Sequence, residues 1–392
     1  MSTVYLHIGT AKTGTTALQR FFVSNRSRLN KKDFDHPIMP FHFPRMADGR
    51  NAHFLTLWQE ADSDERWNKG FEVIKEACGL YGNVTMSDEV LWAQCANDGF
   101  LEAVRKGFDS VGAEVKIIVY LRRQDEMVES HWNQMVKGKL KLTEDFDSFV
   151  GSGGYDRLFP LDYKAVLDRI SACFGRENII VRPYEREQFK DGSIYADFLD
   201  ILGLEPDDEY EISEYAVNTR LPWEVVEIKR VINSIDSYRD PDMPNFFREV
   251  IKDAYGLELS KELPDIRTGR FSGEQRQKFI ARYEEGNALV AREYLNKADG
   301  ILFINKPKDL PRWEPKPAEI HKDIIRVLAG AAVYEYKKRR ELEAKVNKLS
   351  EKVSRLLAQE KDIKDLKDQI KNLTASFPFK LSRRLKGSKE EQ

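Results

Sequence analysis

Apolar residues in the first half of the chain gather in short runs that alternate with stretches of helical spacing. Runs near residues 4–9, 84–87, 115–121 and 178–182 are rich in β-branched and aromatic side chains, which predicts buried strands. This alternation predicts an α/β fold, with a parallel sheet flanked by helices and ligands beyond the carboxyl ends of the strands.

The remaining pattern predicts a polar loop and then a helical region. Residues 35–55 are polar and rich in proline and histidine, which predicts a surface loop at the rim of an acceptor pocket. Farther on, we expect helices and one strand-like run, at 221–235, 245–255, 273–294 and 301–303. We place the end of this domain at residue 310, so that it covers 1–310 and a Pro-rich linker covers 311–319.

Residues 320–373 form a segment dense in Lys and Glu with a seven-residue apolar repeat. The repeat runs from Leu342 to Ile370, and Val346 and Val353 lie four residues after its first two leucines. With leucine at d and valine at a, the pattern predicts a parallel coiled coil and a homodimer through 320–373. In this frame Glu360 and Lys367 fall at a positions and weaken the distal half. One amphipathic helix packed on the rest of the chain is the alternative.

The C-terminal tail, 374–392, mixes basic residues with aromatic residues and leucines. Its stretch 376–386 has the composition of a segment that contacts an anionic membrane surface. An untied solubilising tail explains the same composition, and both interpretations stay open.

The most specific motif is the segment His7 to Thr16, which lies between the first strand and a helical pattern. Gly9 and Gly14 keep the spacing of a phosphate-binding P-loop, but Thr15 occupies the position that a nucleotide kinase gives to lysine. The only lysine of the segment is Lys12, inside the loop. A strand, a glycine loop and a helix in this order predict phosphate binding at a helix N-terminus without metal-dependent γ-phosphoryl transfer.

This segment resembles the 5′-phosphosulfate loop of sulfotransferases that use 3′-phosphoadenosine-5′-phosphosulfate (PAPS), a motif written P-K-[ST]-G-T-[ST]. Ala11 departs from the family proline. The resemblance implies a P-loop-like fold with PAPS as co-substrate, 3′-phosphoadenosine 5′-phosphate (PAP) as product and no metal. It also implies that the donor is bound by Lys12, Thr13, Gly14, Thr15 and Thr16.

A second family element is an arginine after a strand with a serine eight residues on. Arg122 and Ser130 match it, which implies that they hold the 3′-phosphate. The chain reads Arg122-Arg123-Gln124 where many members have R-N-P, so Arg123 is an alternative to Arg122. Residues 178–185 resemble a later family strand, and 267–273 match the family's cofactor loop poorly.

Transfer to a hydroxyl requires a base in addition to the charge of Lys12. Glu89 follows the second predicted strand and is our first candidate, with Asp88 and His53 as rivals. Glu89 also suits the start of a helix, and the two roles are compatible. His7 is expected to point into the core.

Charge, cysteine spacing and the apolar pattern limit the expected partners and cellular location of the protein. The net charge of −2 gives no general attraction to nucleic acid, and Cys78, Cys95 and Cys173 show no zinc or disulfide spacing. We expect no signal peptide and no spanning segment, hence a cytoplasmic protein, peripheral at the inner membrane surface if the tail binds lipid. The resemblance implies a carbohydrate or glycolipid acceptor. The rival functions are a nucleotide-dependent kinase with a degenerate loop and a non-catalytic coiled-coil scaffold.

Overall fold

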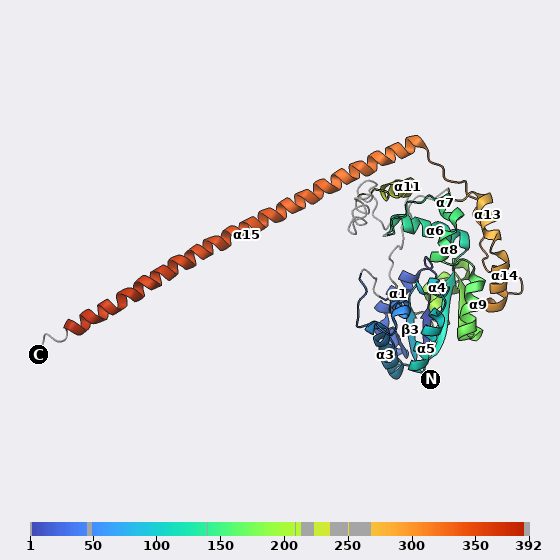
Figure 1. The fold of residues 1–392 in the computed structure, drawn as a ribbon, viewed down its shortest axis with the longest axis horizontal. Helices are drawn as coiled ribbons and strands as arrows, with labels where there is room; N and C mark the ends of the chain where they lie inside the picture. Colours follow the sequence, from blue (N-terminus) through green and yellow to red (C-terminus); the bar gives the residue numbers. More distant parts are fainter. Residues whose placement is uncertain are drawn as a thin grey trace. The chain divides into compact units, whose positions relative to one another are not determined.

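The computed structural model describes residues 2–44, 49–138, 140–207, 209–212, 223–235, 250 and 268–387 (Figure 1). The described residues form two compact units. The first runs to Asp323, and the second consists of residue 250 and the chain from Ile324 onward. The predicted helix at 245–255 lies outside the described residues, except for residue 250.

The first unit is built on a parallel sheet of five strands in the order β2-β3-β1-β4-β5. The strands are β1 (Thr3–His7), β2 (Phe34–Asp35), β3 (Asn83–Ser87), β4 (Glu114–Leu121) and β5 (Ile179–Pro183). The four predicted strands are confirmed to within two residues at each end. β2 escapes the sequence pattern because only two of its residues pair with β3.

β1 lies in the centre of the sheet, where the strand order reverses. β2 and β3 lie on one side of it, and β4 and β5 lie on the other. His7 of β1 is in register with Ser87 of β3 on one side and with Ile118 of β4 on the other. In an open parallel sheet, ligands bind beyond the carboxyl ends of the strands at such a switch point. The ends of β1, β3 and β4 therefore define where a site is expected.

Helices cover the sheet and its ends in the first unit. They are α1 (Thr15–Ser24), α2 (Arg26–Lys31), α3 (Glu65–Leu80), α4 (Leu91–Gln94), α5 (Phe100–Val111), α6 (Gln124–Lys137), α7 (Phe146–Ser152), α8 (Gly154–Leu158), α9 (Tyr163–Phe174), α10 (Ile194–Ile201), α11 (Trp223–Ile232), α13 (Gly273–Ala281) and α14 (Glu284–Leu295). Short 3₁₀ turns add η1 (His53–Glu60), η2 (Arg176–Asn178), η3 (Arg186–Gln188) and η4 (Lys190–Gly192).

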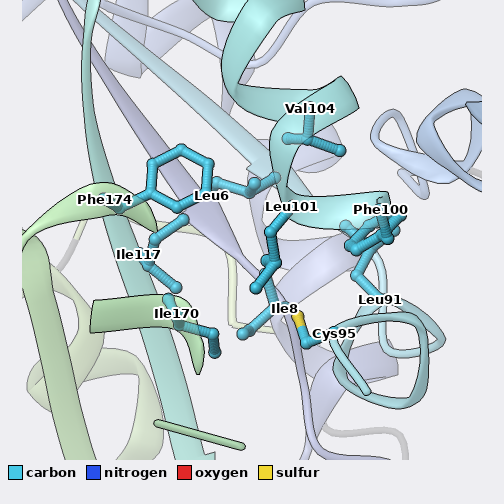
Figure 2. Close-up of a pocket in the computed structure, with 10 residues that line it drawn as sticks. All are labelled: Leu6, Ile8, Leu91, Cys95, Phe100, Leu101, Val104, Ile117, Ile170 and Phe174. Atoms are coloured by element: carbon cyan, nitrogen blue, oxygen red, sulfur yellow. The ribbon is translucent and has the colours of Figure 1, made fainter. Parts of the chain in front are cut away.

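Alternation along the strands sends side chains to two hydrophobic layers. On one face Ile118 and Tyr120 of β4 join a core with side chains of α1, α2 and α10. On the other face, apolar residues in or directly after β1 and α4 meet those of β4, α5 and α9, as Figure 2 shows; these are Leu6, Ile8, Leu91, Cys95, Phe100, Leu101, Val104, Ile117, Ile170 and Phe174. The small hollow among them is lined by apolar side chains and belongs to the core.

Two local expectations from the sequence are wrong. The span 273–294 is two helices, because the amide of Tyr283 bonds the Ile280 carbonyl three residues back and turns the chain. Residues 301–303 form no strand, since the neighbouring amides of Ile304 and Asn305 bond the Glu185 carboxylate and no strand of the described residues pairs with this run.

The C-terminal region is one helix, α15 (Pro317–Gly387). It begins inside the predicted linker and continues into the predicted tail as far as Gly387. The linker residues just before it pack in the first unit, where Gly269 and Arg312 form a parallel bridge and Trp313 is buried. The compact first unit thus extends beyond residue 310, although the predicted functional division of the chain stays a prediction.

Candidate functional site

The glycines of the loop after β1 are required by its backbone and by close neighbours. Gly9 has φ +94°, and a Cβ there would lie 2.8 Å from the Cα of Glu89. Gly14 has φ +75° and is the N-cap residue of α1, and a Cβ there would lie 2.6 Å from the Ile194 side chain. Both positions need glycine for conformation and for space. Gly9 also places the loop directly against the end of β3.

Lys12 lies between these glycines in a left-handed conformation, with φ 67°. Such a conformation is rare for a residue with a side chain and is concentrated at functional sites. Its Nζ is 3.5 Å from Oε1 of Gln134 in α6. Burial, and then the charge of Arg122, lower the pKa of Lys12, whereas Glu89 acts in the opposite direction. The loop lysine is therefore a partly desolvated cation within electrostatic reach of both Arg122 and Glu89.

The threonines of the loop divide into structural and available groups. The hydroxyl groups of Thr10 and Thr13 are buried and donate to the carbonyls of Tyr120 and Thr10, respectively, which ties the loop to β4 and to itself. Thr15 and Thr16 open α1, where the first backbone N–H groups have no acceptor within the helix. Thr13 is therefore a loop-shaping residue through its side chain, and the helix N-terminus is suited to an anion.

Arg122 lies at the end of β4 and holds the lysine loop from the other side. Its Nη1 donates to the Lys12 carbonyl at 3.2 Å, and its own carbonyl accepts a hydrogen bond from the Tyr163 hydroxyl. The same guanidinium contacts Glu126 at 3.1 Å and lies over the ring of Tyr184. The structure therefore brings Lys12 and Arg122 together, with the Glu126 carboxylate beside them.

Arg123 has different surroundings, although it is adjacent in sequence. Its side chain is 5% exposed and donates to both carboxylate oxygens of Asp125 and to the Asn305 carbonyl. Arg276 binds the same buried Asp125. These contacts make Arg123 part of a buried ion network, so Arg122 is the better placed of the two to meet a ligand.

Ser130 is half-buried in α6. Its neighbour Glu129 holds the loop near residue 269. Glu129 accepts the amide of Arg270, whose guanidinium lies 4.5 to 4.9 Å from three tryptophan rings, those of Trp132, Trp223 and Trp313. The described part of the predicted cofactor loop therefore has its Arg270 side chain buried. Arg267 lies outside the described residues.

The end of β3 and the start of η1 carry an acid and histidine pair. Nδ1 of His53 is 2.9 Å from Oδ2 of the fully buried Asp88, and Arg50 donates to both Asp88 oxygens at 2.9 Å. Burial acts to raise the pKa of Asp88, but the hydrogen bonds from His53 and Arg50 outweigh it and hold the pKa below its usual value. An ionised Asp88 can only accept a hydrogen bond, so in neutral His53 the proton lies on Nδ1 and Nε2 carries the free lone pair.

Glu89 has two partners that hold its carboxylate. Gln19 donates to it at 3.0 Å, and Arg50 lies 3.4 Å away as an ion pair. Asp88 in turn accepts the amide of Val90 at 2.8 Å. The helix-start role expected of Glu89 is not seen, because α4 begins at Leu91 after Val90 and has no side-chain cap. His7 is fully buried behind this cluster and bonds Ser87, as expected for a core residue.

Sequence reasoning missed several side chains of this site. Arg50 joins Asp88 to Glu89, yet it lies in the predicted loop and no motif marks it. Gln134 and His131 lie on α6 close to Lys12, and burial and then Lys12 lower the pKa of His131 to about 3. His131 and Gln134 are three residues apart on α6, so they are neighbours on the helix surface. This spacing could have indicated them once Ser130 was placed on the same helix.

The described residues contain no group of three or more His, Cys, Asp or Glu side chains that could hold a metal ion. In the same part of the chain, no helix is both long and apolar enough to cross a membrane.

Comparison with known proteins finds limited similarity. No model of a known protein family matches the chain. An uncharacterised protein of Archaeoglobus fulgidus is 30% identical over 207 residues, which make up 50% of this chain and 52% of that protein. The chain thus spans about half the length of the curated relative it matches.

Among solved structures, a sulfotransferase from Alicyclobacillus acidocaldarius is 18% identical, with a TM-score of 0.36 over 61% of this chain and 96% of that chain. The sulfotransferase domain from the curacin biosynthetic pathway is 14% identical, with a TM-score of 0.33 over 72% of this chain and 96% of that domain.

Proposed function

We propose that this protein is a sulfotransferase that moves the sulfuryl group of PAPS to a hydroxyl or amine of a carbohydrate acceptor and releases PAP. One observation carries the proposal: Lys12, in a left-handed loop conformation at a helix N-terminus, is joined through its backbone to Arg122. A loop lysine and a strand-end arginine at one sheet edge provide cationic contacts for two separate phosphate groups of a nucleotide.

The cations and backbone N–H groups of this site match the negative charges of a phosphosulfate group. Gly9 packs against the backbone of Glu89, and the first N–H groups of α1 follow this loop without a side-chain cap. PAPS supplies a sulfuryl group on a phosphate leaving group, and in-line transfer of this kind depends mainly on positioning and charge stabilisation. In this proposal Lys12 neutralises the bridging oxygen, and Arg122 and Ser130 hold the 3′-phosphate. The amides of Gly14, Thr15 and Thr16 hold the 5′-end of the donor.

Among the candidate bases, the geometry favours His53. Its Nδ1 bonds the buried Asp88, so Nε2 can take the proton of an acceptor hydroxyl while Asp88 stabilises the imidazolium. Glu89 is bonded to Gln19 and paired with Arg50, which favours an orienting role for it. The ring of Phe43, in the loop predicted to rim the acceptor pocket, packs edge-on against His53 with 4.7 Å between centroids.

The acceptor class, the cytoplasmic location and the membrane contact through 376–386 stay predictions. A nucleotide-dependent kinase remains the rival function within the enzyme class. It requires Mg²⁺ and a lysine directly after the second glycine, where this chain has Thr15.

The experiment that tests the donor is calorimetric titration of PAP and AMP into the full chain in the presence of EDTA. We expect PAP to bind at least tenfold more tightly than AMP, because each charge-assisted contact to the 3′-phosphate contributes about 1.5–3 kcal/mol. Equal affinities would contradict the proposed donor.

The base is tested with two matched variants in a transfer assay. His53→Ala should lower kcat/KM by about 10²–10⁴-fold, the usual contribution of a general base, while PAP binding is retained. Glu89→Gln should retain most of the transfer. The opposite ranking, with PAP binding intact in both variants, would move the base to Glu89.

A further inference from the structure

The second compact unit of the chain has a continuous apolar stripe that faces solvent. α15 is one unbroken helix, and in its middle the side chains of Leu342, Val346, Leu349, Val353 and Leu356 are each 53–62% exposed. A helix in a protein gains most of its stability by packing such a stripe against something else. The stripe is therefore an interaction surface, and its sequence specifies the occupant.

The proximal part of the stripe follows one heptad frame. Val346 and Val353 occupy a positions, and Leu342, Leu349 and Leu356 occupy d positions. β-branched residues at a with leucine at d favour two parallel strands. The same frame, continued, puts Glu360 and Lys367 at a, where charges oppose packing.

The distal part of the stripe fits a second frame, offset by three residues. Ile363, Leu366, Ile370 and Leu373 are spaced by three, four and three residues, and each is 53–67% exposed. This spacing makes the isoleucines a residues and the leucines d residues. The second frame thus repeats the residue preference of the first, with β-branched side chains at a and leucine at d.

The offset changes where the charges of the distal part lie. In the second frame Glu360 and Lys367 move from a to e, at the edge of the seam, and Asp362 occupies g. In a parallel pair, a g residue faces the e residue five positions later on the other helix. Asp362 of one helix would therefore face Lys367 of the other, which is a complementary pair.

We propose that two copies of this chain pair in parallel through α15, along two seams joined by a three-residue phase shift between Leu356 and Ile363. An insertion of three residues locally overwinds a coiled coil, and helices can continue through it without a break. The proximal and distal halves both pack in this arrangement, so the distal half is a full part of the dimer interface.

The phase shift makes a prediction for neighbouring positions 366 and 367. Leu366 is a d residue in the shifted frame but a g residue in the single frame, whereas Lys367 is e in the shifted frame but a in the single frame. In a parallel homodimer, a core residue lies next to its own copy. A cysteine at a core position should therefore form a disulfide with its copy faster than one at the edge.

The test uses the full chain with single cysteine variants, mild oxidation and non-reducing electrophoresis. Leu349→Cys is the positive control, because residue 349 is a d position of the proximal part, which both the single-frame and the two-seam arrangements share. The wild-type chain gives the background from Cys78, Cys95 and Cys173. We expect Leu366→Cys to cross-link at a rate close to Leu349→Cys and at least tenfold faster than Lys367→Cys.

The other outcomes overturn specific parts of the proposal. Faster cross-linking of Lys367→Cys would restore the single frame. A dimer by sedimentation in which none of the three variants cross-links would mean an antiparallel pair. A wild-type chain that sediments as a monomer at high concentration would show that the stripe is covered by the chain itself or by another protein. As a second measurement, Lys367→Ile should change the dimer dissociation constant less than threefold. The single frame, which puts residue 367 in the core, requires this constant to fall tenfold or more.

Discussion

The adjacent arginines after β4 provide the sharpest test of the site, because the structure gives them opposite roles. Arg122 is partly exposed and is bonded to Glu126 and to the Lys12 carbonyl, whereas Arg123 is buried with Asp125 and Asn305. We expect Arg122→Ala to lose donor selectivity with little loss of stability. We expect Arg123→Ala to lose stability instead.

The magnitudes follow from these environments. An i,i+4 ion pair near the surface, such as the partly exposed pair of Arg122 and Glu126, contributes about 0.3–0.5 kcal/mol to folding. A lost charge-assisted contact to the 3′-phosphate costs about 1.5–3 kcal/mol, or roughly 10- to 150-fold in PAP affinity. Removal of Arg123 leaves the buried Asp125 with fewer partners, and breaking a buried pair costs about 3–5 kcal/mol.

The assay combines calorimetric titration of PAP and AMP with urea denaturation of each variant. Arg122→Ala should bring the PAP to AMP affinity ratio close to one at wild-type stability. Glu126→Gln is the matched companion: it removes a carboxylate beside Arg122 and should tighten PAP binding a few-fold. An Arg122→Ala protein that still prefers PAP would refute the assignment, and loss of the preference in a stable Arg123→Ala protein would transfer it to Arg123.

Three further predictions address the loop, the core and the C-terminal helix. Lys12→Ala should fold and lower the transfer rate about 10²–10³-fold, the effect of removing one transition-state contact, whereas Lys12→Arg should retain more of the rate. Near wild-type turnover of Lys12→Ala would remove Lys12 from the mechanism. Burial lowers the pKa values of His7 and His36 to about 4. The unfolded chain takes up these protons near pH 6.5, so the free energy of unfolding should fall as pH drops from 6.5 to 4, by up to about 3 kcal/mol per histidine, and a flat urea-denaturation series would contradict this. Leu349→Asp should break the dimer measured by light scattering, and truncation after residue 315 should give a monomer that still binds PAP, whereas truncation after 310 also removes the buried Trp313 and should destabilise the fold.

The sequence predicted the parts of the fold that depend on local pattern. The strands β1, β3, β4 and β5 were visible because each has at least two buried apolar side chains within a short run of the chain. The glycine spacing of the loop was visible because tight backbone geometry accepts few other residues. Elements that depend on a single tertiary contact, such as the short β2, gave no pattern of their own.

The site was predictable only in part for the same reason. Lys12 and Arg122 are marked by motifs at fixed distances from strands, and the structure brings them together. Arg50 is important because it bridges Asp88 and Glu89, which are brought near it by the sheet, and nothing in its neighbours along the chain indicates this. The different roles of Arg122 and Arg123 likewise depend on Asp125 and Asn305, which only the fold places around Arg123.

The most direct test of sulfuryl transfer is mass spectrometry of a panel of soluble glycans incubated with the full chain, PAPS and EDTA. The proposal predicts a sulfated glycan and an equal amount of PAP, both absent when ATP replaces PAPS and both strongly reduced in Lys12→Ala. Phosphorylated glycans formed from ATP and Mg²⁺, with no product from PAPS, would contradict it.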